Sequence, residues 1–353
     1  MRYYELTLYQ PDDKALTKPY CTWTSHPNGQ FDPCALGISF DAMVYPMDTP
    51  AGGTPVTLTG IALDELKQST QLGMHIDSAG KVQPGMLCVL KAGMGKGLPL
   101  VNPAQQGVLL KGTIWQCFGN WEGTSMTLDF VIYCAAFTTN QPGNLVLNWK
   151  AGMKLSDALQ ACLKVAYPDS KLDINISPQL VQSADDPHFS GTLEQLSSHV
   201  RDMTKGKFLG DNYPGVSIVA QPGKISVFDA TNTGSAQPTQ INFTDLIGQP
   251  TWISLGTMQM KLVLRGDLQV GTFITMPKSM SSVAGQVQTT SNSWLGNINA
   301  DVTFQGTFMI TKLRHIGDSR SPDGAAWCTV IDCIATDLTA GTASSTTGQG
   351  NGS

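Results

Sequence analysis

The sequence has few charged residues and no long apolar run. Asp, Glu, Lys and Arg make up 14% of the 353 residues, and the basic ones form no cluster of the kind that follows a phosphate backbone. No stretch approaches the roughly 20 apolar residues that a bilayer-spanning helix requires. The first residues contain no apolar signal core. These absences disfavour tight nucleic-acid binding and membrane spanning, and predict a soluble protein made in the cytoplasm.

Sequence patterns for metal or covalent chemistry are also missing. The eight cysteines contain no Cys-x-x-Cys pair, and there is no His-Glu-x-x-His or Gly-x-Ser-x-Gly pattern. Because nothing indicates an oxidising compartment, most of the cysteines are predicted to be reduced, buried small residues. Cys328 and Cys333 are predicted on opposite faces of one strand, so they are poor disulfide partners for each other.

Four segments partly resemble functional motifs, and a structural explanation is favoured for each. Segment 93–97 (Gly-Met-Gly-Lys-Gly) lacks the Ser or Thr that follows the lysine of a phosphate-binding loop. Segment 185–187 (Asp-Asp-Pro) lacks the rest of a calcium loop. The spacing of His188 and His199 fits no metal-ligand pattern. Segment 315–318 (His-Ile-Gly-Asp) offers a base and a carboxylate, but adjacent loop residues usually stabilise a turn. The sequence therefore predicts no catalytic residue, metal ligand or cofactor.

What the sequence does contain is glycine, proline and residues alternating with a period of two. Its 36 Gly and 20 Pro are typical of many short strands joined by turns. Tyr4, Leu6 and Leu8 share one face of a predicted strand, and residues 124–134 alternate in the same way. Residues 61–72 are predicted to form a short helix with Leu63 and Leu66 facing inward.

The middle of the chain has the pattern of a small α+β region. Apolar residues recur at helical spacing over 155–166, and Thr192 and Gln195 resemble the capping box of a second helix. Its inward residues are predicted to be Leu193, Leu196, Val200 and Met203. Segments 216–220 and 224–229 flank a Pro-Gly turn and predict a hairpin. Residues 140–245 are therefore predicted to be a separate α+β domain.

The last part of the chain returns to β patterning. Met258, Met260, Leu262 and Leu264 alternate strictly with Gln259, Lys261, Val263 and Arg265. Residues 304–314 and 327–334 predict two further strands. Residues 278–300 predict a loop, and 339–353 predict a disordered tail. The fold class is therefore mainly β with an α+β middle domain, with domains at 1–139, 140–245 and 246–338; strands near 100–135 are also candidates for the last β region.

Several short stretches resemble the baseplate hub proteins of contractile-tailed bacteriophages. The stretches are 92–100, 121–130, 144–149, 245–252, 264–271 and 313–327, and their order matches the β, α+β, β layout. The family-like structural positions are Gly93, Gly97, Trp121, Trp149, Pro250, Trp252, Arg265, Gly266, Asp267, His315, Gly317, Asp318 and Trp327. Some hub relatives carry a fused lysozyme or a spike extension; neither is expected here, so any wall-degrading activity is expected to come from a separate protein.

This resemblance implies a fold, an assembly and a set of partners. Two tail-tube-like antiparallel β-barrels per chain would form a pseudo-sixfold ring in a homotrimer. Such a ring would join a hexameric tail tube, or its initiator protein, to a trimeric central spike, with other baseplate proteins around it. DNA would pass through the channel without specific binding. The implied location is the tail baseplate of the virion, assembled in the cytoplasm of the host bacterium.

Three alternatives remain open from the sequence. A tube initiator or adapter ring would use the same barrel with six copies rather than three. A hydrolase or peptidase acting on the cell wall would require a catalytic pattern that the sequence does not contain. A carbohydrate-binding module is suggested only by Trp23, Trp121 and Trp294, which lie among turn residues.

Overall fold

A computed structural model describes most of the chain. The described residues are 2–47, 53–95, 102–134, 144–168, 170–211, 213–222, 224–229, 231, 237–254, 257–277, 286–287 and 306–336. Gly97, Trp294 and the predicted tail 339–353 lie outside them, as does most of the predicted loop 278–300. Two residues inside that predicted loop, Gln286–Val287, instead form the short strand β19.

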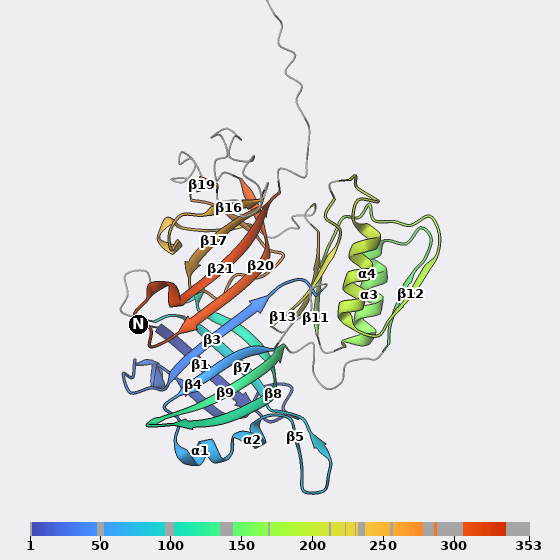
Figure 1. The fold of residues 1–353 in the computed structure, drawn as a ribbon. Coiled ribbons are helices and arrows are strands. Elements are labelled where there is room, and N and C mark those ends of the chain that lie inside the picture. The colour runs from blue at the N-terminus through green and yellow to red at the C-terminus, as the bar shows by residue number, and fades with distance from the viewer. Residues whose placement is uncertain are drawn as a thin grey trace, which may run out of the picture.

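Seven strands from the first third of the chain form one half of a large sheet (Figure 1). They run in the order β3-β4-β9-β8-β7-β1-β2. Their bounds are β1 Arg2–Tyr9, β2 Pro19–Thr24, β3 Gly37–Val44, β4 Thr54–Thr59, β7 Leu87–Met94, β8 Gly107–Glu122 and β9 Ser125–Cys134. The predicted alternation is confirmed, because Tyr4, Leu6 and Leu8 of β1 are buried, as are Leu128 and Phe130 of β9.

Short elements lie beside these strands. They are α1 Leu63–Lys67, α2 Ser69–Leu72, β5 His75–Ile76 and β6 Val82–Gln83. The predicted single helix over 61–72 is therefore divided at Gln68, and the prediction that Leu63 faces inward is wrong, since its side chain is 39% exposed. Ile61, which precedes α1, and Leu72, the last residue of α2, are buried in the first core, and Leu66 packs against that core as predicted.

Strands from the last third of the chain form the other half of the sheet. Their bounds are β15 Thr239–Gln240, β16 Thr251–Ser254, β17 Thr257–Val263, β18 Phe273–Thr275, β20 Thr307–Asp318 and β21 Trp327–Ala335. β17 pairs with β21 and β21 with β20, all antiparallel. Met258, Met260, Leu262 and Leu264 are buried, as their alternation predicts. From the sequence, strands near 100–135 are also candidates for this region. The strands found there, β8 and β9, pair with β7, with β4 and with each other, and neither pairs with a strand of this half.

β20 joins the two halves into one sheet. One edge of β20 pairs with β21 along most of its length. On the other edge, Thr307–Met309 pair with β18 and Leu313–Asp318 pair with β3. Within the described residues the pairings form an open path from β2 to β19 rather than a closed ring. The mainly β fold class is thereby confirmed, whereas closure into two barrels stays a prediction.

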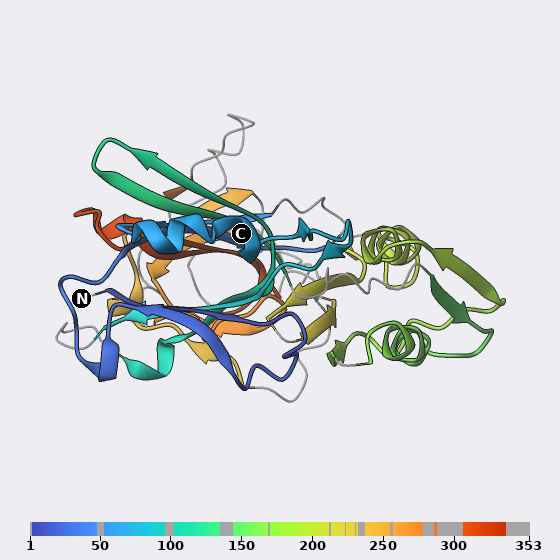
Figure 2. The same ribbon diagram turned by 90° about the horizontal axis from the view of Figure 1, so that it is seen from below.

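The middle of the chain forms layers of its own beside the large sheet (Figures 1 and 2). The elements are β10 Leu145–Trp149, α3 Leu155–Ala166, β11 Lys171–Asn175, β12 Asp186–Ser190, α4 Leu193–Thr204, β13 Ser217–Gln221 and β14 Lys224–Phe228. β10 pairs with β12, and β11, β14 and β13 form a three-stranded sheet that lies toward the large sheet. α3 and α4 lie between these two small sheets. Thr192 caps α4 by accepting a hydrogen bond from the backbone N–H of Gln195, as predicted.

Three buried clusters stabilise the three parts by removing apolar surface from water. The first lies under β1–β9 and includes Leu264 and Trp327 from the last third of the chain. The second lies under β16–β21 and includes Val219 and Phe228 from the middle hairpin. The third fills the α+β layers around Trp149. Each cluster draws residues from neighbouring segments, and the predicted domain limits near 140 and 245 remain predictions.

Candidate functional site at the junction of the two β regions

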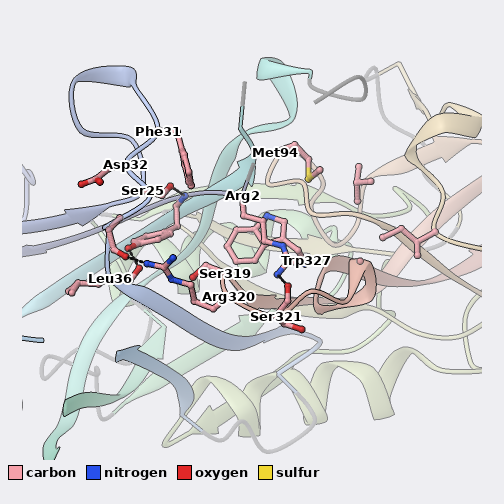
Figure 3. A pocket seen from close by; sticks show the side chains of 15 residues that line it. Arg2, Ser25, Phe31, Asp32, Leu36, Met94, Ser319, Arg320, Ser321 and Trp327 are labelled. Carbon is pink, nitrogen blue, oxygen red and sulfur yellow. Dashed lines mark hydrogen bonds between the residues drawn. The ribbon is translucent and has the colours of Figure 1, made fainter. Parts of the chain in front are cut away.

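A pocket lies where the two halves of the large sheet meet (Figure 3). It has a volume of about 540 Å³ and walls that are mainly apolar. Its lining comes from the start of β1, the segment after β2, the end of β7, β17 and the loop between β20 and β21. Figure 3 shows Phe31, Met94 and Trp327 around the space, with the guanidinium groups of Arg2 and Arg320 beside them.

Arg2 connects the first strand to the β20–β21 loop. Its guanidinium donates hydrogen bonds to the backbone carbonyls of Asp318, Ser321 and Asp323. The same group lies over the ring of Trp327, 5.7 Å from the ring centroid, at a cation–π distance. Burial lowers the pKa of Arg2, and the nearby carboxylates oppose this shift. Because backbone carbonyls accept the hydrogen bonds of its guanidinium, Arg2 acts as a structural link between β1 and the β20–β21 loop rather than as a ligand-binding group.

Trp327 is the aromatic centre of the junction. It is buried, and its indole N–H donates a 2.9 Å hydrogen bond to the carbonyl of Gly93. Its ring meets Phe40 of β3 edge-to-face at 5.5 Å. A Cβ on Gly317 would lie 2.2 Å from the Phe40 ring, so only glycine leaves room for that ring. Trp327, Gly93 and Gly317, all singled out in the sequence, are therefore brought together.

Arg265 forms a second, buried connection. It donates two hydrogen bonds to the carboxylate of Asp267, at 2.8 and 2.7 Å, and one to Asp245 at 3.2 Å. Gln105 donates to the other oxygen of Asp245 at 2.9 Å. The side chains of Arg265 and Asp245 are only 3% and 7% exposed, so their charges depend on each other. Gly266 follows Arg265 and packs directly against Gly107, joining the same two regions.

His315 is a structural residue of this cluster. The prediction that it lies in a loop is wrong, because β20 extends to Asp318 and buries His315 between its neighbours. Its Nδ1 is 3.0 Å from the hydroxyl of Thr329, which also bonds to the backbone of Arg265. Burial lowers the pKa of His315 to about 3. The carboxylate of Asp318 accepts backbone N–H groups of its own loop instead of orienting His315, so the base-and-orienter hypothesis has no support.

The remaining predicted positions lie away from the junction. Trp149 is buried among the α+β layers and donates to the carbonyl of Met153, while Pro250 and Trp252 pack in the last β region. Trp121 lies at the end of the β8–β9 hairpin and is 60% exposed. Asp245, Gln105 and Arg2 were missed, because hydrogen bonds between residues more than a hundred positions apart leave no local pattern.

The other chemical candidates are not assembled into sites. Within the described residues no three His, Cys, Asp or Glu side chains gather as metal ligands would. Nor does the described part contain a helix long and apolar enough to cross a bilayer. Segment 185–187 is no free loop, since Asp186 and Pro187 already belong to β12. Trp23 is partly buried and packs against the first core near Phe130.

The outward face of β8 and β9 carries exposed aromatic side chains. Trp115 and Phe118 are exposed on β8, and Trp115 contacts Tyr133 of β9 edge-to-face at 5.6 Å. Trp121 is also exposed, but it follows Phe118 by three positions and lies on the opposite face of the strand pair. The hairpin that carries Trp121 projects from the body of the sheet (Figure 2). Exposed aromatic groups on a rigid strand pair are typical of protein–protein contact surfaces.

Comparisons with known proteins identify no family. No family model and no curated protein matches the chain. Among solved structures, a 43 kDa tail protein of prophage MuSo2 from Shewanella oneidensis is 9% identical, covers 96% of this chain and 98% of its own, and has a TM-score of 0.45. A tail protein from Neisseria meningitidis is 11% identical over 94% of this chain and 96% of its own, also at 0.45.

A third solved structure is the c3393 protein of E. coli, described as a type VI secretion component similar to T4 tail proteins gp27 and gp5. It is 9% identical over 85% of this chain and 73% of its own, with a TM-score of 0.46. All three TM-scores are below 0.5, so these likenesses do not define the class of this protein.

Proposed function

We propose that the protein is a non-catalytic structural hub of a phage tail baseplate, built as a ring-forming symmetry adapter. The observation that carries the proposal is the bridging by β20, which pairs with β3 of the first half and β18 of the second. A rigid link between two β regions in one chain is what an adapter needs, since each chain then contributes two similar positions to a ring. The sequence resemblance to hub proteins supports the same role.

The symmetry follows from counting β regions. Three chains with two tube-like β regions each give six positions around an axis, which match a sixfold tube on one side and a threefold spike on the other. The hub proposal includes closure of each region into a tail-tube-like barrel. The hydrogen bonds from Trp327 to Gly93, and from Gln105 to the Asp245 that pairs with Arg265, then keep the two regions of one chain in fixed register.

Two kinds of surface are available for contacts between copies. The described sheet ends at β2 on one side and at β19 on the other, and the outer edge of such a strand offers backbone groups for pairing with another chain. The exposed aromatic face of β8 offers apolar area. In this proposal, copies of the chain contact each other through these surfaces. The tail tube, the spike and other baseplate proteins bind at the open ends of the ring.

The charge balance suits a channel through which DNA moves. The net charge is -5, and the basic residues are dispersed, so a channel lined by this chain would not hold DNA tightly. The proposed location is the tail baseplate of the virion, with assembly in the host cytoplasm.

Electron microscopy and particle mass of the purified protein test this proposal. The expected result is a ring of three copies with a central hole. Trp115→Ser combined with Phe118→Ser is expected to reduce the ring population at a given concentration, whereas Val165→Ser, on the 85% exposed position of α3, is the matched control. A protein that stays monomeric at high concentration, with and without tube and spike partners, would contradict the hub.

Six copies per ring would instead favour a tube initiator or adapter ring, which uses the same β regions. The structure offers no observation that favours this candidate over three copies, so stoichiometry decides between them. A cell-wall hydrolase is the remaining class. Peptidoglycan cleavage in a zymogram, abolished by substituting one carboxylate or histidine, would replace the non-catalytic proposal.

A further inference from the structure

The α+β layers contain a pair of stacked histidine rings. His188 of β12 and His199 of α4 have ring centroids 3.3 Å apart and planes inclined by only 5°. Both side chains are half-buried, and Leu147 of β10 is the register partner of His188. The stack is therefore a direct contact between the outer two-stranded sheet and the helix beneath it. It belongs to neither the junction nor the proposed copy-to-copy surfaces.

This geometry does not suit a metal site. The nitrogen lone pairs of an imidazole lie in the plane of its ring, and two parallel rings 3.3 Å apart direct them side by side rather than toward one point. No third His, Cys, Asp or Glu completes a ligand group among the described residues. The contact is one between two flat ring faces.

The same geometry opposes protonation. Nε2 of His199 is buried and has no hydrogen-bond partner in the described part of the chain, so a proton placed there has neither water nor an acceptor. A charge on both rings places two like charges at stacking distance. Burial first, and then the neighbouring His188, lower the pKa of His199. A proton is therefore accommodated best when the rings separate and the imidazole meets water.

The charged groups around the pair only partly offset this effect. Asp186 of β12 and Asp202 of α4 favour a proton on His199, and Lys207, which follows α4, disfavours it. Burial remains the largest influence, and the net shift is downward. Because the pKa of His199 is lower in the folded layer than its ordinary value of 6.5, the open form binds more protons. The closed form therefore loses stability as pH falls below about 6.5.

We propose that the His188–His199 stack is an acid-sensitive latch, which holds β12 on α4 near neutral pH and releases it when His199 takes up a proton. The layer that it releases has an apolar outer face, since Val146 of β10 and Phe189 of β12 are register partners and both are exposed. Acid thereby changes the position of an apolar surface on the far side of the helices from the large sheet. The latch is independent of the proposed hub role.

Hydrogen exchange of the full-length protein at pH 7.5 and pH 5 tests the latch. After correction for intrinsic exchange, peptides covering β12 and α4 are expected to exchange about tenfold faster at pH 5, whereas peptides from β11, in the three-stranded sheet of the same α+β layers, keep their protection. The variant His188→Phe combined with His199→Phe retains two flat rings and cannot be charged, so it is expected to lose the acid response. His75→Phe, in the separate β5–β6 hairpin, is the control and should respond as the wild type does.

Two results would overturn the latch. The first is wild-type protein whose β12 and α4 peptides are equally protected at both pH values, a result that does not depend on any variant folding. The second is a folded double variant that responds to acid as the wild type does. Peptides from β20 and β21 report on His315 separately, so a change confined to them does not support the latch.

Discussion

The indole N–H of Trp327 donates a hydrogen bond of 2.9 Å to the carbonyl of Gly93, 234 residues earlier in the chain. Trp327→Phe retains an aromatic ring beside Phe40 but leaves that carbonyl buried without its donor. The expected destabilisation is about 1–3 kcal/mol. Chemical denaturation measures it, with Trp121→Phe as control. Trp121 also donates to a carbonyl, but in water, so its loss is expected to cost less than about 0.5 kcal/mol.

Arg265 is expected to be the most sensitive position of the junction. Arg265→Met retains apolar bulk but removes the partner of Asp245, whose buried carboxylate then has no opposite charge. Removing one member of such a pair costs about 3–5 kcal/mol. Arg314→Met breaks the ion pair with Asp41, which is exposed, and is expected to cost about 1 kcal/mol or less. An equal loss of stability in Arg265→Met and Arg314→Met would contradict the prediction that the buried ion pair contributes more than the exposed one.

The contact between Gly107 and Gly266 predicts a steric effect. A Cβ on Gly107 would lie 2.7 Å from the carbonyl oxygen of Gly266, and backbone on both sides prevents a small adjustment. Gly107→Ala is therefore expected to lower stability by about 1–3 kcal/mol. Gly324→Ala meets nothing within 4 Å and is the control. A Tm for Gly107→Ala as high as that of the control would rule out close packing here.

His315 predicts a loss of stability in acid. Burial lowers its pKa to about 3, whereas an unfolded chain binds the proton near 6.5. Stability therefore falls as pH drops below 6.5, by about 2 kcal/mol at pH 5 relative to neutral pH. His315→Gln retains a group that can bond to Thr329 and is expected to remove this part of the loss. Denaturation of both proteins at pH 7.5 and pH 5 provides the comparison.

The sequence predicts local elements well where one face is buried. Strands β1, β9 and β17 and helices α3 and α4 follow from apolar periodicity, because a single core selects one face of each. The helix over 61–72 was predicted only in part: Leu66 packs against the core as predicted, but Leu63 is exposed and the chain turns at Gln68. His315 was misplaced because glycine after it suggested a turn, whereas Gly317 is needed for the Phe40 ring.

The site was predicted only in part for a different reason. Arg265, Asp267, Trp327 and Gly93 could be selected from the sequence, but not which of them contact each other, nor the partners Asp245 and Gln105. Arg265 finds Asp245 and Gln105 through the fold, and the rings of His188 and His199 meet because β12 and α4 pack together. Such contacts depend on tertiary packing, and no spacing along the chain reveals them.

The pairing of β3 with β20 also has a consequence for synthesis of the chain. Residues 39–44 have as partners residues 313–318, which leave the ribosome about 270 positions later. Until then one edge of β3 has no strand beside it, and an exposed strand edge can pair with other chains. Protection of this edge therefore has to wait for nearly the whole polypeptide. We expect forms of the chain that are truncated before β20 to aggregate, because they lack the strand that covers β3.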